Sequence, residues 1–246
     1  MTEERKPGEI GKVLADASAS PSLTRLRHRS GVRMAAKLCR TGLILQVRGH
    51  IFGTGRIDGT SPRGNGDDEI VAVGALLQIA GELTKPAVQL LSKGEHYAGA
   101  ALVRQVVEVE YLMWAFASNP GEARMWVNST REQRMKFFQP ARLRRRSNGR
   151  FRDVDYAHHC EMGGHPVPRS LTLIGRADNR TVQLLIVDVL LHGWRITNSA
   201  IEWSAKKDLL DGVRTELESV RAMLARWSKA DPLRKLTERP APPTWP

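Results

Sequence analysis

One segment of the chain, residues 95–117, is apolar on most sides when it is drawn as a helix. One apolar stripe repeats at steps of three and four residues: Leu102, Val106, Val109, Met113 and Phe116. This period matches the turn of an α-helix and predicts a buried face. A second stripe lies beside the first: Val103, Val107 and Trp114. Because a helix that is apolar on most sides has to be surrounded, we expect this one at the centre of a bundle.

Other segments predict the helices that surround it. They are residues 23–47, 67–94, 119–126, 129–138, 178–201 and 210–227. The acids Asp67, Asp68 and Glu69 are expected at a helix start, capping residues are expected at Asn119, Ser129 and Asp178 or Asn179, and Pro86 is expected to kink or divide its helix. No segment alternates like a strand. The chain therefore predicts an all-α fold, a single bundle of about five to seven helices over residues 23–229.

The two ends and one internal segment predict irregular structure. Residues 1–22 are polar and are expected to form a flexible tail, and residues 230–246 contain five prolines and are expected to be disordered. Residues 49–66 contain six glycines and predict an exposed loop. The glycines do not form the Gly-x-x-x-x-Gly-Lys-Ser/Thr pattern that binds nucleotide phosphates, so we assign no nucleotide site to them.

The cysteine content and the apolar runs bear on the compartment. Two cysteines, Cys39 and Cys160, cannot build a disulfide framework, and the sequence shows no signal peptide. The longest apolar run, residues 184–191, is too short to span a bilayer and contains Asp188. These features predict a soluble protein of the reducing cytoplasm with no membrane partner.

The positive charge is concentrated in two parts of the chain. The net charge is +12, with 28 arginines against 10 lysines. Residues 17–57 hold eight basic residues and no acid, and residues 131–152 hold nine basic residues and one acid. If these stretches met in space they could bind a nucleic acid, whereas separate stretches are typical of solvated helix faces. Both interpretations stay open.

Residues 150–168 are rich in side chains that carry chemistry. A possible metal-binding set is His158, His159, Cys160, Glu161 and His165. The alternative is a tight corner at Gly163-Gly164 whose histidines are hydrogen-bonded to the bundle. No second Cys/His cluster has a standard zinc spacing and no Glu-x-x-His pair occurs. We therefore assign no metal and no cofactor.

The central helix carries a charged pair. Arg104 and Glu108 are four residues apart and can form an ion pair along one face, while Glu110 lies on another. The pair can be a structural clasp, or Glu108 can be a catalytic carboxylate. In either case we expect the histidine-rich bend to pack against this helix.

Arg152 is followed by Asp153, and five residues separate it from His158. This spacing resembles the Arg-polar-x-His signature of the HEPN (higher eukaryotes and prokaryotes nucleotide-binding) helical superfamily. For its ribonucleases, the resemblance implies that His158 is a general acid or base toward a 2′-hydroxyl and that Arg152 stabilises the scissile phosphate. His165 is expected nearby as a third candidate. In this chain two long helices follow the motif, which departs from the compact HEPN arrangement.

A wider resemblance covers about residues 70–225. The segments Ala101–Trp114 and Tyr156–Pro166 resemble an uncharacterised bacterial all-helical family of unknown function, distantly HEPN-like, with an Arg-x-x-x-Glu helix followed by a Tyr…His-Pro corner. The resemblance implies a helical bundle without an assigned reaction. It implies site or scaffold roles for four residues: Arg104, Glu108, Tyr156 and His165.

The leading functional hypothesis is a binding or interaction protein with no established catalysis, self-associating as a homo-oligomer or binding a partner. The alternative is a metal-independent, HEPN-like ribonuclease or RNA-binding, toxin-like protein, and a third hypothesis is nucleic-acid binding through the two basic stretches. The catalytic candidates are Arg152, His158 and His165. The binding candidates are Arg104, Glu108, Tyr156, Arg144, Arg145 and Arg146.

Overall fold

The structure, a computed structural model, describes residues 7–51, 67–175, 177–206 and 211–237. Its elements are α1 (Pro7–Ala19), α2 (Pro21–Ile51), α3 (Asp68–Lys93), α4 (His96–Ser118), α5 (Glu122–Val127), α6 (Arg131–Phe137), α7 (Pro140–Arg146), α8 (Asp153–His159), the π-helical turn η1 (Cys160–Gly164), the 3-10 turn η2 (Pro168–Leu173), α9 (Asn179–Ser204), α10 (Asp211–Ala230) and α11 (Pro232–Thr237). No strand occurs within the described ranges, which confirms the all-α prediction. The predicted number of five to seven helices is wrong, since these residues form eleven α-helices.

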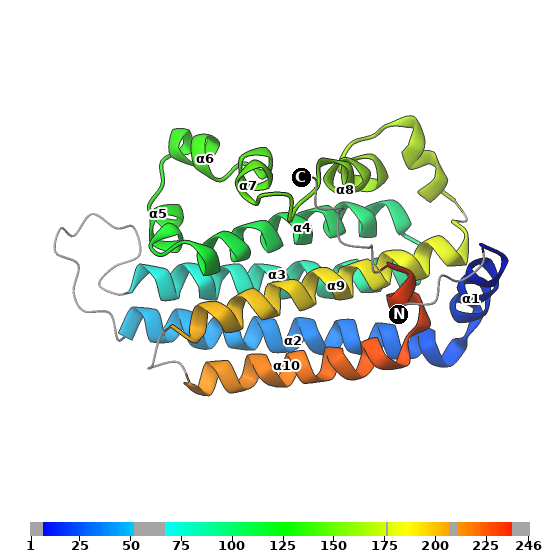
Figure 1. Ribbon diagram of the computed structural model, residues 1–246, viewed down its shortest axis with the longest axis horizontal. Coiled ribbons are helices and arrows are strands. Elements are labelled where there is room, and N and C mark those ends of the chain that lie inside the picture. Colours follow the sequence, from blue (N-terminus) through cyan, green and yellow to red (C-terminus); the bar gives the residue numbers. More distant parts are fainter. Residues whose placement is uncertain (1–6, 52–66, 176, 207–210, 238–246) are drawn as a thin grey trace, which may run out of the picture.

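Five long helices form the bundle: α2, α3, α4, α9 and α10 (Figure 1). Helix α4 packs between α3 and α9, as its two apolar stripes predict. Val103, Val106 and Met113 are fully buried there. The short helices α5–α8 lie along the outer side of α4, whereas α2 and α10 form the opposite side of the bundle (Figure 1). The apolar pattern of α4 therefore predicts its central position.

Helix α3 begins at the predicted run of acids and ends at Gly94, as the sequence predicts. The Asp67 side chain accepts hydrogen bonds from the backbone of Glu69 and Ile70, and Gly94 ends the helix with φ 91°, a conformation that favours glycine. Pro86 lies inside the helix and does not divide it. By length and composition α3 is apolar enough to cross a membrane, but 61% of its most apolar window is buried inside the bundle. That burial is typical of a core helix.

The capping residues predicted for α5 and α6 are each displaced. Gly121 with φ 83°, not Asn119, precedes α5. The capping box of α6 joins Thr130 to Gln133. Ser129 is not the cap because its hydroxyl donates to the carbonyl of Trp126 and so closes the preceding helix.

Both ends of the described chain contain helices where the sequence predicted loose tails. Residues 7–19 form α1 and residues 232–237 form α11, and these two helices contact each other. Residues 1–6 and 238–246 lie outside the described residues, as do 52–66, which make up most of the predicted glycine-rich loop.

A buried ion pair explains the order at the C-terminal end. Arg27 on α2 and Asp231, between α10 and α11, are paired through two hydrogen bonds of 2.7 Å, and both side chains are fully buried. Arg27 also donates to the carbonyl of Ala17 on α1 and to Gln183 on α9. Asp231 accepts a further bond from the indole of Trp227. Four helices thus converge on one charged pair.

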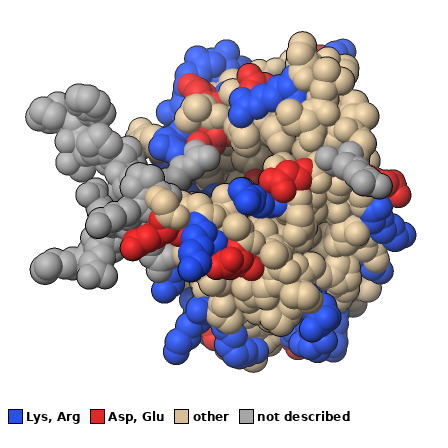
Figure 2. All heavy atoms as spheres, turned by 90° about the vertical axis from the view of Figure 1, so that its right-hand side faces the viewer, with Lys and Arg blue, Asp and Glu red and all other residues tan. Residues whose placement is uncertain are grey.

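The described parts of the two basic stretches lie on different helices. The described part of the first lies mainly on α2, and the second lies mainly on α6 and α7, with α3 and α4 between them (Figure 1). On the end face drawn in Figure 2, Lys and Arg form separate groups with acids beside several of them. Nucleic-acid binding through these stretches stays a prediction.

We expect Asp231→Asn to lower the free energy of unfolding by about 3–5 kcal/mol, because the Arg27 charge would stay buried without a counter-charge. The matched control is Glu216→Gln, which removes a carboxylate paired with Lys37 at 3.4 Å in a half-exposed position. Its cost should stay below about 1 kcal/mol. Chemical denaturation of both variants measures the difference, and equal costs would contradict the role of the buried pair.

Candidate functional site

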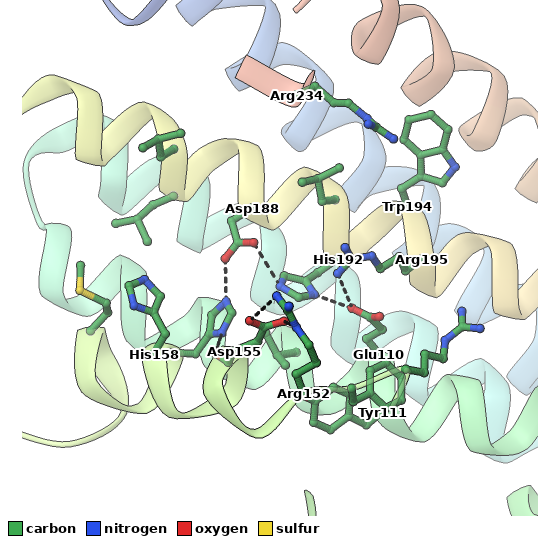
Figure 3. Close-up of a pocket in the computed structure, with 18 of the residues that line it drawn as sticks. Glu110, Tyr111, Arg152, Asp155, His158, Asp188, His192, Trp194, Arg195 and Arg234 are labelled. Carbon is green, nitrogen blue, oxygen red and sulfur yellow. Dashed lines mark hydrogen bonds and ion pairs between the residues drawn. The ribbon is translucent and has the colours of Figure 1, made fainter. Parts of the chain in front are cut away.

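A cleft of about 1070 Å³ lies between α4, α8 and α9, with α11 at its rim (Figure 3). Its polar lining comes from four α-helices, from the turn η2 and from the segment that precedes α8. Helix α4 contributes Glu110 and Tyr111, α8 contributes Asp155, His158 and His159, α9 contributes Asp188, His192 and Arg195, and α11 contributes Arg234. The volume is at the upper end of the range of small-molecule sites, so the cleft can hold a ligand of nucleotide size.

His192 is at the inner end of the cleft, where it is 5% exposed. Its Nδ1 donates a hydrogen bond to the Glu110 carboxylate. Its Nε2 faces Asp188, one turn earlier on α9, with 3.3 Å between Nε2 and Oδ1. That nitrogen is buried and makes no hydrogen bond within the described chain. His192 therefore joins α4 to α9 through one nitrogen and leaves the other directed at a carboxylate.

His159 approaches the same carboxylate from α8. Its Nε2 lies 2.7 Å from Asp188 Oδ2, and its Nδ1 lies 2.6 Å from the backbone carbonyl of Asp155. The rings of His159 and His192 are 5.2 Å apart between centroids. Asp188 is thus flanked by two imidazoles, one on each oxygen.

The electrostatics of this cluster are strongly coupled. Burial acts to lower the pKa of His192, but the charges of Asp188 and Glu110 outweigh it and raise that pKa to about 9. Burial likewise acts to raise the pKa of Asp188, but the two histidines hold it well below its usual range. Asp188 is therefore an anion over the whole physiological range.

One group in the described part of the chain has the donor atoms for a metal ion: His159, Asp188 and His192, whose ligand atoms lie within 4.8 Å of one another. Of the five residues that the sequence offered as a metal set, only His159 belongs to this group. Glu161 instead pairs with Arg169 at 2.7 Å and is exposed.

The structure places two of the three catalytic candidates in the cleft and the third outside it. Arg152 and His158 both line the cleft. Arg152 forms a two-bond pair with Asp155, at 3.1 and 3.2 Å. Burial, together with His159 and Arg169, lowers the pKa of His158. His165 is exposed and lies outside the cleft lining.

Three predicted binding residues, Arg104 and Glu108 on α4 and Tyr156 on α8, bind one another and do not line the cleft. We call these three residues the clamp. The Tyr156 hydroxyl donates to Glu108 at 2.7 Å and accepts from Arg104 at 3.1 Å, and Arg104 and Glu108 are also paired at 2.9 Å. Burial and the bond to Glu108 raise the pKa of Tyr156 to about 12, so the hydroxyl keeps its proton. This clamp places the histidine-bearing helix against α4, as the sequence predicts.

The arginine run of α7 lies outside the cleft. Arg144 stacks over the Tyr156 ring at 4.2 Å and pairs with Asp153 at 2.7 Å. Arg145 is exposed, and Arg146 pairs with Glu122. Arg144 therefore supports the clamp from the other side of the tyrosine ring.

The glycine pair of the bend serves close packing. A Cβ at Gly163 would lie 2.5 Å from the backbone carbon of Ala100 on α4, so a side chain does not fit there. Neither Gly163 nor Gly164 has a positive φ, which corrects the expectation of unusual dihedrals. The turn η1 needs glycine because it lies directly on the α4 backbone.

Three central residues were not among the site candidates: Glu110, Asp188 and His192. Each is a polar residue inside an apolar helix, and Asp188 and His192 are four residues apart on one helix face. The sequence feature that could have identified these residues was therefore their position, as polar residues at helical spacing within a buried stripe. Their meeting with His159 depends on tertiary packing.

Comparison of the chain with protein-family models, with curated proteins and with solved structures finds no match.

We expect Tyr156→Phe to lower the free energy of unfolding by about 1 kcal/mol, since the ion pair of Arg104 and Glu108 survives while the bonds of the hydroxyl are lost. Amide hydrogen exchange should accelerate in α8 and η1 but not in α10. The control is Tyr97→Phe, because Tyr97 is partly buried and its hydroxyl makes no hydrogen bond with the described residues. Unchanged exchange in α8 would show that the clamp does not hold this helix.

Proposed function

We propose that the chain is a binding protein for a phosphate-bearing ligand of about nucleotide size, which occupies the cleft between α4, α8 and α9. The observation that carries the proposal is the charge of the lining. Five arginines line the cleft: Arg150, Arg152, Arg169, Arg195 and Arg234. Only three carboxylates do so: Glu110, Asp155 and Asp188. Arginine suits phosphate because its planar guanidinium can donate two parallel hydrogen bonds.

Two of these arginines repel each other across the rim. Burial and the charge of Arg195 lower the pKa of Arg234, which also lies 5.8 Å from the centre of the Trp194 ring. Arg195 is half-exposed, and its contact to Glu110 is long, at 3.7 Å. An anion bound between the two guanidiniums would relieve this repulsion, which supports a phosphate position at the rim (Figure 3).

The proposal predicts that Arg195→Ala weakens binding of adenosine diphosphate and of pyrophosphate at least tenfold, about 1.4 kcal/mol. The matched control is Arg40→Ala, which removes an exposed arginine on α2 outside the cleft. Isothermal titration of the full chain measures both variants at two salt concentrations. No binding of either probe at millimolar concentration, or equal losses in the two variants, would contradict the proposal.

A second candidate, metal-independent cleavage of RNA, is favoured by one observation. Arg152 and His158, the pair that resembles the HEPN signature, line the same cleft. A lowered pKa would leave His158 neutral at pH 7 and able to accept a proton from a 2′-hydroxyl. Arg152 would then have to exchange its bonds to Asp155 for bonds to the phosphate.

For this candidate we expect labelled RNA to be cleaved equally well with and without chelator. Cleavage should fall at least a hundredfold in His158→Ala, and the matched control His165→Ala should retain it, since His165 is exposed and away from the cleft. Intact RNA with the wild-type protein removes the ribonuclease and leaves the binding function to be judged by the titration.

Self-association, location in the cytoplasm and RNA binding through a single basic stretch stay proposals from the sequence. A monomeric mass in light scattering would contradict the first, and binding that does not weaken with salt would contradict the third.

A further inference from the structure

The two inner histidines of the cleft present the same arrangement of nitrogens. In each, Nδ1 is the donor in a hydrogen bond, His159 to the Asp155 carbonyl and His192 to the Glu110 carboxylate. In each, Nε2 is directed at Asp188. Histidines that bind metals through one nitrogen commonly donate the other to a carbonyl or a carboxylate. Both partners of this kind are present here.

In this arrangement both Nε2 atoms face the Asp188 carboxylate, and a positive species is needed between them. His159 directs its Nε2 at a carboxylate oxygen 2.7 Å away. His192 directs its Nε2 at the other oxygen from 3.3 Å, and this buried nitrogen makes no hydrogen bond with the described residues. A positive species between the two Nε2 atoms and the Asp188 carboxylate would give each of the three groups a favourable partner. Such a species is either a proton on the imidazoles or a metal ion.

The distances between donor atoms fit a metal ion. Ligands at about 2.0–2.2 Å from a tetrahedral ion are about 3.3 Å from one another. The ligand atoms of His159, Asp188 and His192 all lie within 4.8 Å, so small side-chain shifts bring them to one ion. The His192 side chain is 6% exposed and that of Asp188 is 31% exposed. The group is therefore buried on its inner side and accessible from the cleft.

We propose that His159, Asp188 and His192 form a binding site for one divalent transition-metal ion, with Glu110 and the Asp155 carbonyl orienting the two imidazoles. Two imidazoles and one carboxylate suit Zn²⁺, Fe²⁺ or Co²⁺, whereas Mg²⁺ and Ca²⁺ prefer oxygen ligands only. The two charges of the ion balance Asp188 and Glu110, the two carboxylates that contact His192.

The site goes beyond the proposed binding function and does not depend on it. Its three ligands line the same cleft as the arginines, so an ion held there would face any ligand of the cleft. With three protein ligands the ion keeps at least one position open for water or for a ligand atom. The sequence did not reveal the site because its ligands come from two helices, α8 and α9, whose packing the sequence pattern does not specify.

The test is titration of the chelator-treated full chain with Zn²⁺, with Co²⁺ as a spectroscopic probe and Mg²⁺ as the control ion. We expect one Zn²⁺ per chain, d–d absorption bands for bound Co²⁺, and no heat with Mg²⁺. His159→Ala and Asp188→Asn should each weaken Zn²⁺ binding at least a hundredfold. Glu110→Gln should weaken it tenfold to a hundredfold, as expected for a group that orients a ligand.

The matched control is His158→Ala, which removes the adjacent histidine of the same cleft and should bind Zn²⁺ like the wild type. Equal losses in His158→Ala and His159→Ala would show adventitious binding to the histidine-rich bend and overturn the site. Wild-type protein without stoichiometric binding would also overturn it, with a proton network as the conclusion. Because Asp188→Asn changes no volume, its circular dichroism and its Zn²⁺ titration together decide the case if another variant does not fold.

Discussion

The pairing of Arg27 with Asp231 is the interaction on which the ends of the bundle depend. A fully buried guanidinium is tolerated only when its donors are used, and Arg27 donates four hydrogen bonds, two to Asp231 at the α10–α11 junction and one each to α1 and α9. The pair holds the start of α11 against α2. Arg234 follows Asp231 by one turn and thereby reaches the cleft rim beside Trp194. Through α11, the buried pair of Arg27 and Asp231 thus fixes the position of the Arg234 charge at the cleft rim.

The requirement that buried polar groups have hydrogen-bond partners also helps to distinguish structural polar clusters from candidate binding sites. Each nitrogen of the Arg27 guanidinium has a hydrogen-bond partner within the bundle. At the inner end of the cleft, the Nε2 of His192 is buried without a hydrogen bond in the described residues. An incomplete buried group costs free energy that the bundle has to supply from its apolar packing. A ligand or an ion that binds the Nε2 of His192 would offset this free-energy cost.

Local signals predicted the parts of the fold that local interactions determine. Asp67 and Gly94 define the ends of α3, and the apolar stripes of α4 predict its central position, because both features act within a few residues. Helices α1 and α11 were not predicted, since their order depends on contacts with each other and on Arg27. The candidate site shows the same difference between local signals and tertiary packing. Arg152 and His158 were visible as a motif, but the convergence of Glu110, His159 and His192 arises from the packing of three helices.

The separation of the cleft's parts along the chain has a consequence for biosynthesis. Arg27 and its partner are 204 positions apart, and the walls of the cleft come from α4, α8, α9 and α11. A nascent polypeptide on the ribosome can form the α2–α3 hairpin early, whereas the cleft closes only after residue 231 has left the exit tunnel. Before that point the histidines of α8 and α9 are already synthesised, but the rim residues that α11 contributes are not.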